Sequence, residues 1–115
     1  MPATYQPDVY IAQLGIEARK RCLQLFNELR SIGLVLAEDV SKTGLKDQLE
    51  QADKRGVKYA LILGQKEIAD GTVLIRDMES CVQETVDYKK IKTEIKKRLD
   101  AHVMMESTLK KKRGM

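Results

Sequence analysis

The sequence predicts an α/β protein in which a mixed five-stranded sheet carries helices on both faces. Short apolar runs typical of strands alternate with segments whose apolar residues recur every three or four positions, as on one face of a helix. The expected order of elements is β-α-β-α-β-β-β-α. Two strand–helix–strand units make the first three strands parallel, and a turn at Asp70-Gly71 makes the fourth strand antiparallel to the third.

The first part of the chain predicts two strands joined by a helix. The strands are expected at Val9–Leu14 and at Leu34–Glu38. Between them, apolar side chains at spacings of three and four predict a helix from about Ile16 to Ser31. Gly33 follows as a residue that readily takes the left-handed geometry of a helix end.

The middle of the chain predicts the helix and strand around which the other elements are arranged. A polar turn at residues 41–44 opens a helix in which Leu45, Leu49 and Ala52 share one face. The apolar run Tyr59–Leu63, bounded by glycines, predicts a fully buried strand.

The last part of the chain predicts a hairpin and a final helix. Thr72–Asp77 is rich in β-branched residues and predicts the fourth strand, and Cys81–Val86 predicts a half-exposed fifth strand. Asp87 is a suitable N-cap for a helix whose buried stripe is Tyr88, Ile91, Ile95 and Leu99. We expect a flexible lead-in at residues 1–8, one domain at 9–100, and a basic, disordered tail at 101–115.

Composition limits the classes of protein to which this chain belongs. At 115 residues with 43% hydrophobic and 33% charged residues, we expect one soluble domain that buries its own core. No apolar run has the length of a membrane span, so a cytoplasmic location is expected. Cys22 and Cys81 are expected to be free thiols, and the single His102 makes metal-dependent or histidine-based catalysis improbable.

Basic residues concentrate near the C-terminus. Residues 88–115 contain ten Lys and Arg against three Asp and Glu, whereas residues 1–87 contain eleven against fourteen. Such a segment is compatible with binding to a polyanion, and equally with a solvated helix face that has a frayed basic end.

The sequence lacks the motifs of the common catalytic and phosphate-binding sites. It contains no GxGxxG and no GxxxxGK[ST], and neither a GxSxG nor a Cys–His pair supports nucleophilic catalysis. We therefore expect that the chain alone is not catalytic and binds no metal or cofactor.

The carboxyl ends of the parallel strands mark the edge where a site is expected. These ends fall at Leu14-Gly15, Glu38–Thr43 and Gly64–Lys66, and ligands of open α/β sheets bind at this side of the sheet.

Several segments together resemble the C-terminal anticodon-binding domain of class IIa aminoacyl-tRNA synthetases, most closely that of histidyl-tRNA synthetase. The similarity covers about residues 8 to 99 and is carried by Val9–Leu14, Glu28-Leu29-Arg30, Gly33, Leu45–Leu49, Ala52-Asp53-Lys54, Gly56, Ala60–Gly64, Glu67, Gly71-Thr72-Val73 and Asp77. The expected fold is then a three-layer α/β/α domain with three helices and strand order 2-1-3-4-5, the fourth strand antiparallel.

The resemblance implies recognition of a tRNA anticodon, here the one for histidine, without aminoacylation by the chain itself. In such enzymes, histidine-tRNA ligases, aminoacylation is carried out by a separate catalytic domain. If this chain is an excised domain, the resemblance implies that catalytic domain as its partner. No membrane partner is expected. A single-stranded loop is read through base edges, stacking and phosphates, so we select polar residues at the predicted edge. These candidate RNA-binding residues are Gln13, Glu17, Arg21, Lys42, Thr43, Lys46, Gln65 and Lys66. For stacking, Tyr88 and Arg76 are the candidates.

Each candidate also has a structural interpretation. Lys46 is equally consistent with a solvated helix position, Thr43 with an N-cap, and Glu17 with a complement to the positive end of its helix. Two other functions stay open for the whole chain. One is a free-standing protein-interaction or regulatory module that has lost tRNA selectivity, and the other is a nonspecific nucleic-acid binder driven by residues 88–115.

Overall fold

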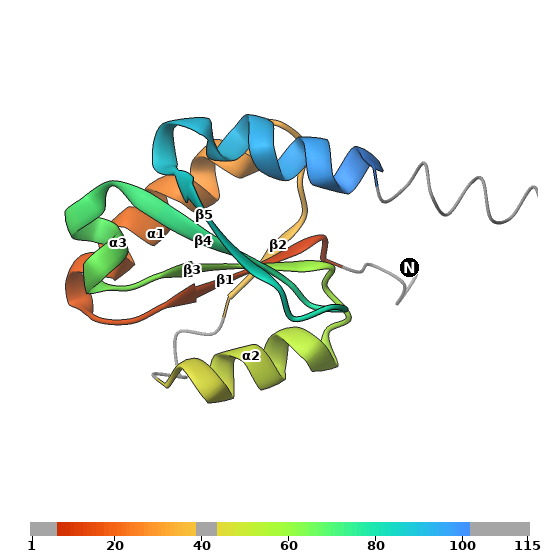
Figure 1. Cartoon of the computed structure of the whole chain (residues 1–115), viewed down its shortest axis with the longest axis horizontal. Coiled ribbons are helices and arrows are strands. Elements are labelled where there is room, and N and C mark those ends of the chain that lie inside the picture. Colours follow the sequence, from red (N-terminus) through yellow and green to blue (C-terminus); the bar gives the residue numbers. More distant parts are fainter. Residues whose placement is uncertain (1–6, 39–43, 102–115) are drawn as a thin grey trace, which may run out of the picture.

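A five-stranded mixed sheet with order β2-β1-β3-β4-β5 forms the middle layer of the structure, a computed structural model that describes residues 7–38 and 44–101 (Figure 1). Strand β1 runs parallel to β2 and β3, and β4 runs antiparallel to both β3 and β5. The predicted fold class, strand order and strand directions are therefore confirmed. The strands are β1 (Val9–Gln13), β2 (Leu36–Ala37), β3 (Tyr59–Leu63), β4 (Thr72–Asp77) and β5 (Gln83–Asp87).

Helices cover both faces of the sheet, which gives the predicted three layers (Figure 1). One face packs against α1 (Ile16–Arg30), the short α3 (Gln65–Asp70) and a C-terminal helix that spans residues 91–101 of the described chain. A 3-10 turn, η1 (Tyr88–Lys90), leads into that C-terminal helix. The other face packs against α2 (Leu45–Lys54).

The core lies on the two faces of the central strands. β1 and β3 are buried along their whole length because each has a neighbouring strand on both sides and a helix layer above and below. Alternate residues of β1 point to opposite faces, so Val9 and Ile11 join the α1 layer while Tyr10 and Ala12 join the α2 layer. Continuous apolar runs in both strands are the sequence signature of this two-sided burial.

Three elements differ from the sequence prediction. β2 pairs with β1 through only two residues, Leu36 and Ala37. The fifth strand begins at Gln83 instead of Cys81, which lies in the preceding turn with φ of 65°. The helix α3 was not predicted, because six residues are too few to show a helical period. Asp87, predicted as the N-cap of the last helix, instead caps the 3-10 turn before that helix, where its carboxylate accepts the Lys89 N–H at 3.0 Å.

Several predictions concern residues outside the described ranges. The N-terminal residues of the predicted lead-in, the residues of the predicted tail beyond Ala101, and His102 belong to this group. Within the described ranges, Cys22 is buried, Cys81 is exposed, and both are free thiols as predicted. No helix in the described part of the chain combines the length and apolarity that a membrane crossing requires.

Candidate functional site

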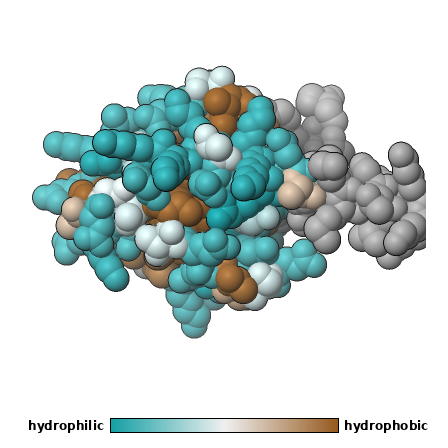
Figure 2. All heavy atoms as spheres, turned by 45° about the horizontal axis from the view of Figure 1, so that its top comes forward, coloured by the Kyte–Doolittle hydropathy of each residue, from teal (hydrophilic) through white to brown (hydrophobic). Residues whose placement is uncertain are grey.

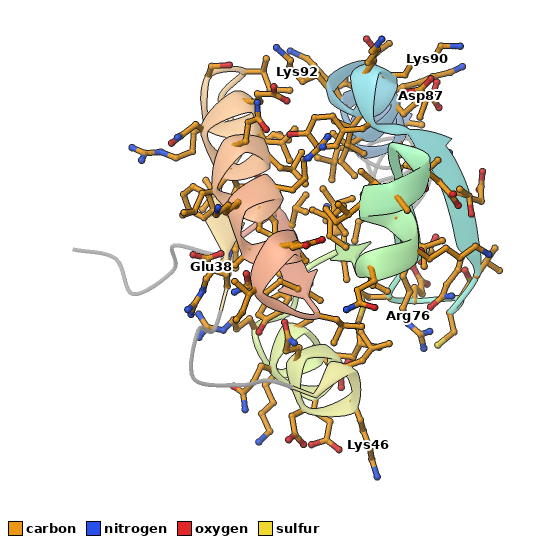
Figure 3. All side chains as sticks on the ribbon, turned by 90° about the vertical axis from the view of Figure 1, so that its left-hand side faces the viewer. Glu38, Lys46, Arg76, Asp87, Lys90 and Lys92 are labelled. Carbon is orange, nitrogen blue, oxygen red and sulfur yellow. The ribbon has the colours of Figure 1, made fainter. Side chains whose placement is uncertain are left out.

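One end of the sheet gathers the starts of three helices, and we call it the strand-end edge (Leu14–Glu17, Gly44–Gln48 and Gly64–Glu67). Here β1 passes into α1, β3 passes into α3, and α2 begins at Leu45. The Leu14 N–H donates to the Leu63 carbonyl at 2.9 Å, which extends the β1–β3 pairing to this end. Figure 3 looks onto the edge, with α1, α2 and α3 all starting toward the viewer. Three segments that are distant in the sequence therefore lie together at the predicted location of the site.

A buried glutamine connects α2 to the end of β1. The Gln48 side chain is fully buried, and its Oε1 accepts the Gln13 N–H at 2.9 Å while its Nε2 donates to the Gln13 carbonyl at 2.8 Å. These two bonds satisfy main-chain groups that have no strand partner on that side. The Gln13 side chain is itself 8% exposed, and its buried Oε1 accepts no hydrogen bond from the described residues. Gln48 therefore fixes the start of α2 against the strand that carries Gln13.

The junction between β1 and α1 has an unusual backbone and an exposed apolar side chain. Gly15 has φ of 101° and ψ of 163°, a region that residues with a Cβ rarely adopt. The next residue, Ile16, is 83% exposed, and Glu17 beside it is exposed as well. The edge thus presents an apolar group and a carboxylate to solvent side by side.

The start of α3 presents an amide and an ammonium group. Gln65 and Lys66 are both exposed, immediately after Gly64 at the end of β3. The Glu67 carboxylate accepts the Gly64 N–H at 2.8 Å and so turns back into the helix start. Gly71 then ends the helix in a left-handed conformation. Because Glu67 is engaged with its own helix, Gln65 and Lys66 are the free polar groups of this turn.

Arg21 and Tyr88 form a stacked pair beside the edge. The Arg21 guanidinium lies 4.8 Å from the centre of the Tyr88 ring, a cation–π geometry. The Tyr88 N–H donates to the Gly71 carbonyl at 2.9 Å, which places the start of η1 at this end of the sheet. Burial, and after it the nearby Glu28 carboxylate, raises the pKa of Tyr88 to about 12. One ring face of Tyr88 is thus occupied by Arg21 and is not available to a base.

The structure brings most of the predicted site residues to one end of the molecule. Glu17, Gln65 and Lys66 belong to the strand-end edge, Gln13 directly precedes it as the last residue of β1, and Arg21 lies one helical turn beyond Glu17. Lys46 starts from the same end, but its side chain extends outward from α2, away from the body of the protein (Figure 3). Lys42 and Thr43 lie outside the described residues.

Sequence reasoning missed two residues of this edge, and Arg76 takes a different part from the one expected. Gln48 falls on the same helical face as Leu45, Leu49 and Ala52, so the pattern itself marks it as a buried polar residue. The exposure of Ile16 could not be predicted, because the spacing of apolar residues in the sequence does not show whether a single apolar residue is exposed. Arg76, a predicted stacking candidate, lies on β4, where its guanidinium donates to the Gln83 side chain at 2.9 Å.

The chemistry of the edge is that of a binding surface. Among residues 7–38 and 44–101, no three His, Cys, Asp or Glu side chains come together as metal ligands would. The edge offers several groups to solvent on three helix starts: one amide, two ammonium groups, two carboxylates and one strongly exposed apolar side chain. They are Gln65, Lys46, Lys66, Glu17, Asp47 and Ile16. Such groups suit hydrogen bonds to flat polar ligands and contacts to anions.

Comparisons with known proteins identify the fold and the family to which these features belong. The family model described as the anticodon binding domain matches residues 8–98. The histidine–tRNA ligase of Corynebacterium jeikeium is 40% identical over 80 residues, which cover 70% of this chain and 18% of that protein. The corresponding ligase of Synechocystis is 36% identical over 104 residues, covering 88% of this chain and 23% of the relative.

Two solved structures of histidyl-tRNA synthetases are similar to this chain. The histidyl-tRNA synthetase of Nostoc superposes with a TM-score of 0.77 at 28% identity, over 83% of this chain and 23% of that one. The Staphylococcus aureus synthetase has the same fold, with a TM-score of 0.73 at 24% identity over 80% of this chain and 27% of that one. The chain thus spans about a fifth of the length of the two ligases above, 18% and 23%.

Proposed function

This chain belongs to the anticodon-binding domain family, as the domain found in histidyl-tRNA synthetase-like proteins, and we propose that it recognises the anticodon of a histidine transfer RNA at the strand-end edge. The observation that carries the proposal is the meeting of three helix starts and two strand ends at one place. A loop of single-stranded RNA needs several bases read at once, so a surface built from several rigid elements suits it.

The exposed groups of the edge have distinct roles in this proposal. Gln65 carries an amide that both donates and accepts, which suits the edge of a base. Gln13, at the end of β1, has a buried oxygen without a partner among the described residues, and in this proposal its side chain turns outward to accept from a base that reaches the strand end. Glu17 accepts only, and Ile16 offers an apolar contact to a base face.

The cations of the edge serve the phosphates. Lys66 lies beside Gln65 at the start of α3, and Lys46 extends outward from the start of α2, where RNA backbone would pass. Arg21 adds a positive charge on the ring of Tyr88. Phosphate contacts position the RNA but carry no sequence information, so selectivity belongs to the glutamines and Glu17. Lys42 and Thr43 remain proposed contacts from the sequence.

Aminoacylation is proposed to lie outside this chain. The residues described provide a binding surface, and the matched segment makes up only 18% and 23% of the two matched relatives. In this proposal the chain selects the tRNA, and a catalytic domain, either joined to it or separate, supplies the histidine–tRNA ligase chemistry.

The experiment compares two RNAs. Affinity of the full chain is measured at one fixed salt concentration for histidine tRNA and for the same tRNA with a substituted anticodon. We expect the substituted tRNA to bind at least about fivefold more weakly, since a lost base contact costs on the order of 1–3 kcal/mol.

Equal affinities would reject the proposal. In that case, retained binding to both RNAs would leave a nonspecific polyanion binder, and absent binding would favour a protein-interaction module. Circular dichroism of the same preparation establishes that the chain used in the measurement is folded.

A further inference from the structure

The C-terminal helix presents exposed lysines beside its buried stripe, on the side that borders the end of α1. Ile91, Ile95 and Leu99 are buried in the core, which fixes the orientation of the helix. Lys92 and Lys96 are exposed one helical turn apart, and Lys97 follows. In Figure 2, which brings the top of Figure 1 forward, hydrophilic side chains cover most of this face. We call Lys92, Lys96 and Lys97 the lysine face.

The lysine face borders a shallow groove against the end of α1. The groove has a volume of about 600 Å³, and its lining includes Ile32, the three lysines and Asp100. Among the described residues of this lining, Asp100 is the one carboxylate against three lysines, so positive charge prevails there. The lysine side chains thus have an apolar floor for their methylene groups and open solvent at their ammonium ends.

Arg98 and Glu94 on the same helix are already engaged in ion pairs, whereas Lys92 and Lys96 are not within the described residues. Arg98 donates to Glu84 at 3.0 Å and to Glu94 at 2.9 Å. The hydrogen bond from Arg98 lowers the pKa of Glu94, and Lys97 and Lys90 add to that effect. No ion pair within the described residues involves Lys92 or Lys96. Their charge is therefore available to a ligand.

The lysine face begins beside the strand-end edge, at the same end of the molecule. The helix is preceded by Tyr88, whose N–H bonds Gly71 and whose ring carries Arg21. Figure 3, viewed onto the edge, shows Lys90 and Lys92 at this near end of the helix, pointing to opposite sides. From there Lys96 follows Lys92 after four residues, about 6 Å farther along the helix axis and away from the edge. A ligand bound at the edge and extending beyond it along the helix would meet them in sequence.

We propose that Lys92 and Lys96 bind phosphates of the double-stranded stem that closes the anticodon loop, as a second contact surface separate from the strand-end edge. The inference rests on the proposed function, which puts the loop itself at the edge. Two unpaired ammonium groups one helical turn apart complement the closely spaced negative charges of an RNA backbone. Because the contacts are to phosphate, they strengthen binding without choosing a sequence.

The test is the salt dependence of binding in the full chain. Affinity for histidine tRNA is measured from 50 to 200 mM salt for the wild type and for K92Q/K96Q. Loss of two phosphate contacts makes the slope of log K against log salt shallower by about 1.5. Across this range the wild type should therefore lose about eightfold more affinity than the double variant. The preference for the correct anticodon should stay unchanged.

The matched control is K54Q, at the far end of α2. It removes one positive charge, and it is compared with K96Q alone. We expect a change in slope for K96Q and none for K54Q. An unchanged slope in K92Q/K96Q, or an equal change in K54Q and K96Q, would overturn the inference.

The two proposals fail in different ways. If the wild type does not distinguish the two anticodons, the proposed function fails, yet the comparison of slopes still shows whether the lysine face binds RNA. If the anticodons are distinguished but the slopes agree, only the second surface is wrong. All substituted side chains are exposed, and thermal unfolding curves verify that each variant is folded.

Discussion

The side chain of Gln48 completes both main-chain hydrogen bonds of Gln13, 35 positions earlier in the sequence. At the end of β1, the Gln48 amide provides the hydrogen-bond partners that a neighbouring strand provides for the other residues of β1. Since both partners are buried, the pair joins α2 to the sheet at the place where the proposed RNA site begins.

Replacing Gln48 with leucine should therefore be costly. The variant keeps the volume but leaves the Gln13 N–H and C=O without partners, at about 1–3 kcal/mol each. We expect the free energy of unfolding from urea titration to fall by roughly 2–6 kcal/mol. Glu50→Ala, at an exposed position of the same helix, is the control and should change stability by less than about 0.5 kcal/mol. Equal stability of Q48L and the wild type would show that water satisfies Gln13.

Gly15→Ala should destabilise the protein through its backbone alone. Gly15 has φ of 101°, and a Cβ there would meet no heavy atom within 4 Å, so no steric clash with neighbours contributes. The expected loss is about 1–3 kcal/mol in the free energy of unfolding. Gly44→Ala serves as the comparison, because Gly44 has φ of −86° and its added Cβ would lie 3.9 Å from Asp47. A loss of the same size in both variants would contradict the backbone argument.

The residues at the start of α3 should separate selectivity from affinity. Gln65→Ala removes a proposed base contact, so the preference for the correct anticodon should fall by about 1–3 kcal/mol. Lys66→Ala and Lys46→Ala remove proposed phosphate contacts, and each should weaken binding to both RNAs and flatten the salt slope by about one unit. Lys54→Ala should leave both quantities unchanged. A variant of Gln65 that keeps full selectivity would remove that residue from the proposed site.

The two cysteines should differ sharply in reactivity. Burial, with a further contribution from the charge of Glu38, raises the pKa of the Cys22 thiol to about 12. The thiolate is the nucleophile, so at pH 8 a buried and protonated Cys22 reacts slowly, whereas Cys81 is exposed. Brief treatment with iodoacetamide should give one modification, at Cys81, by mass spectrometry, and two after denaturation. Modification of Cys22 in the native protein at a similar rate would be inconsistent with its burial.

Stability should decline at high pH. In the unfolded chain Cys22 titrates near its ordinary pKa of 9.0, but in the folded protein the pKa is about 12. The stability that comes from its burial is therefore complete below about pH 9 and is lost as the pH rises toward 12. Tyr88, whose pKa is also raised to about 12, acts in the same direction. Urea titrations at several pH values should show a steeper alkaline decline for the wild type than for Cys22→Ala, and equal declines would count against this account.

Local sequence patterns determined most of the fold. β3 and β4 have the predicted bounds, Tyr59–Leu63 and Thr72–Asp77, because each is a short run with a glycine or a turn beside it. The period of α1 and α2, and the reversal before β4, likewise depend on residues close together in the sequence. The strand ends then follow, and with them the location of the strand-end edge.

Tertiary contacts decided what these local patterns cannot express. β2 is only two residues long because only Leu36 and Ala37 pair with β1, opposite Val9 and Tyr10. The bond between Gln13 and Gln48 and the stacking of Arg21 on Tyr88 join residues that are 35 and 67 positions apart. The packing of Ile91, Ile95 and Leu99 determines which side of the last helix is exposed. Arg98 forms ion pairs with Glu84 and Glu94, whereas no residue in the described part of the chain forms one with Lys92 or Lys96. The sequence alone determined which charges the chain contains, and the folded structure decided which of them are free to meet a ligand, since pairing depends on distances in space.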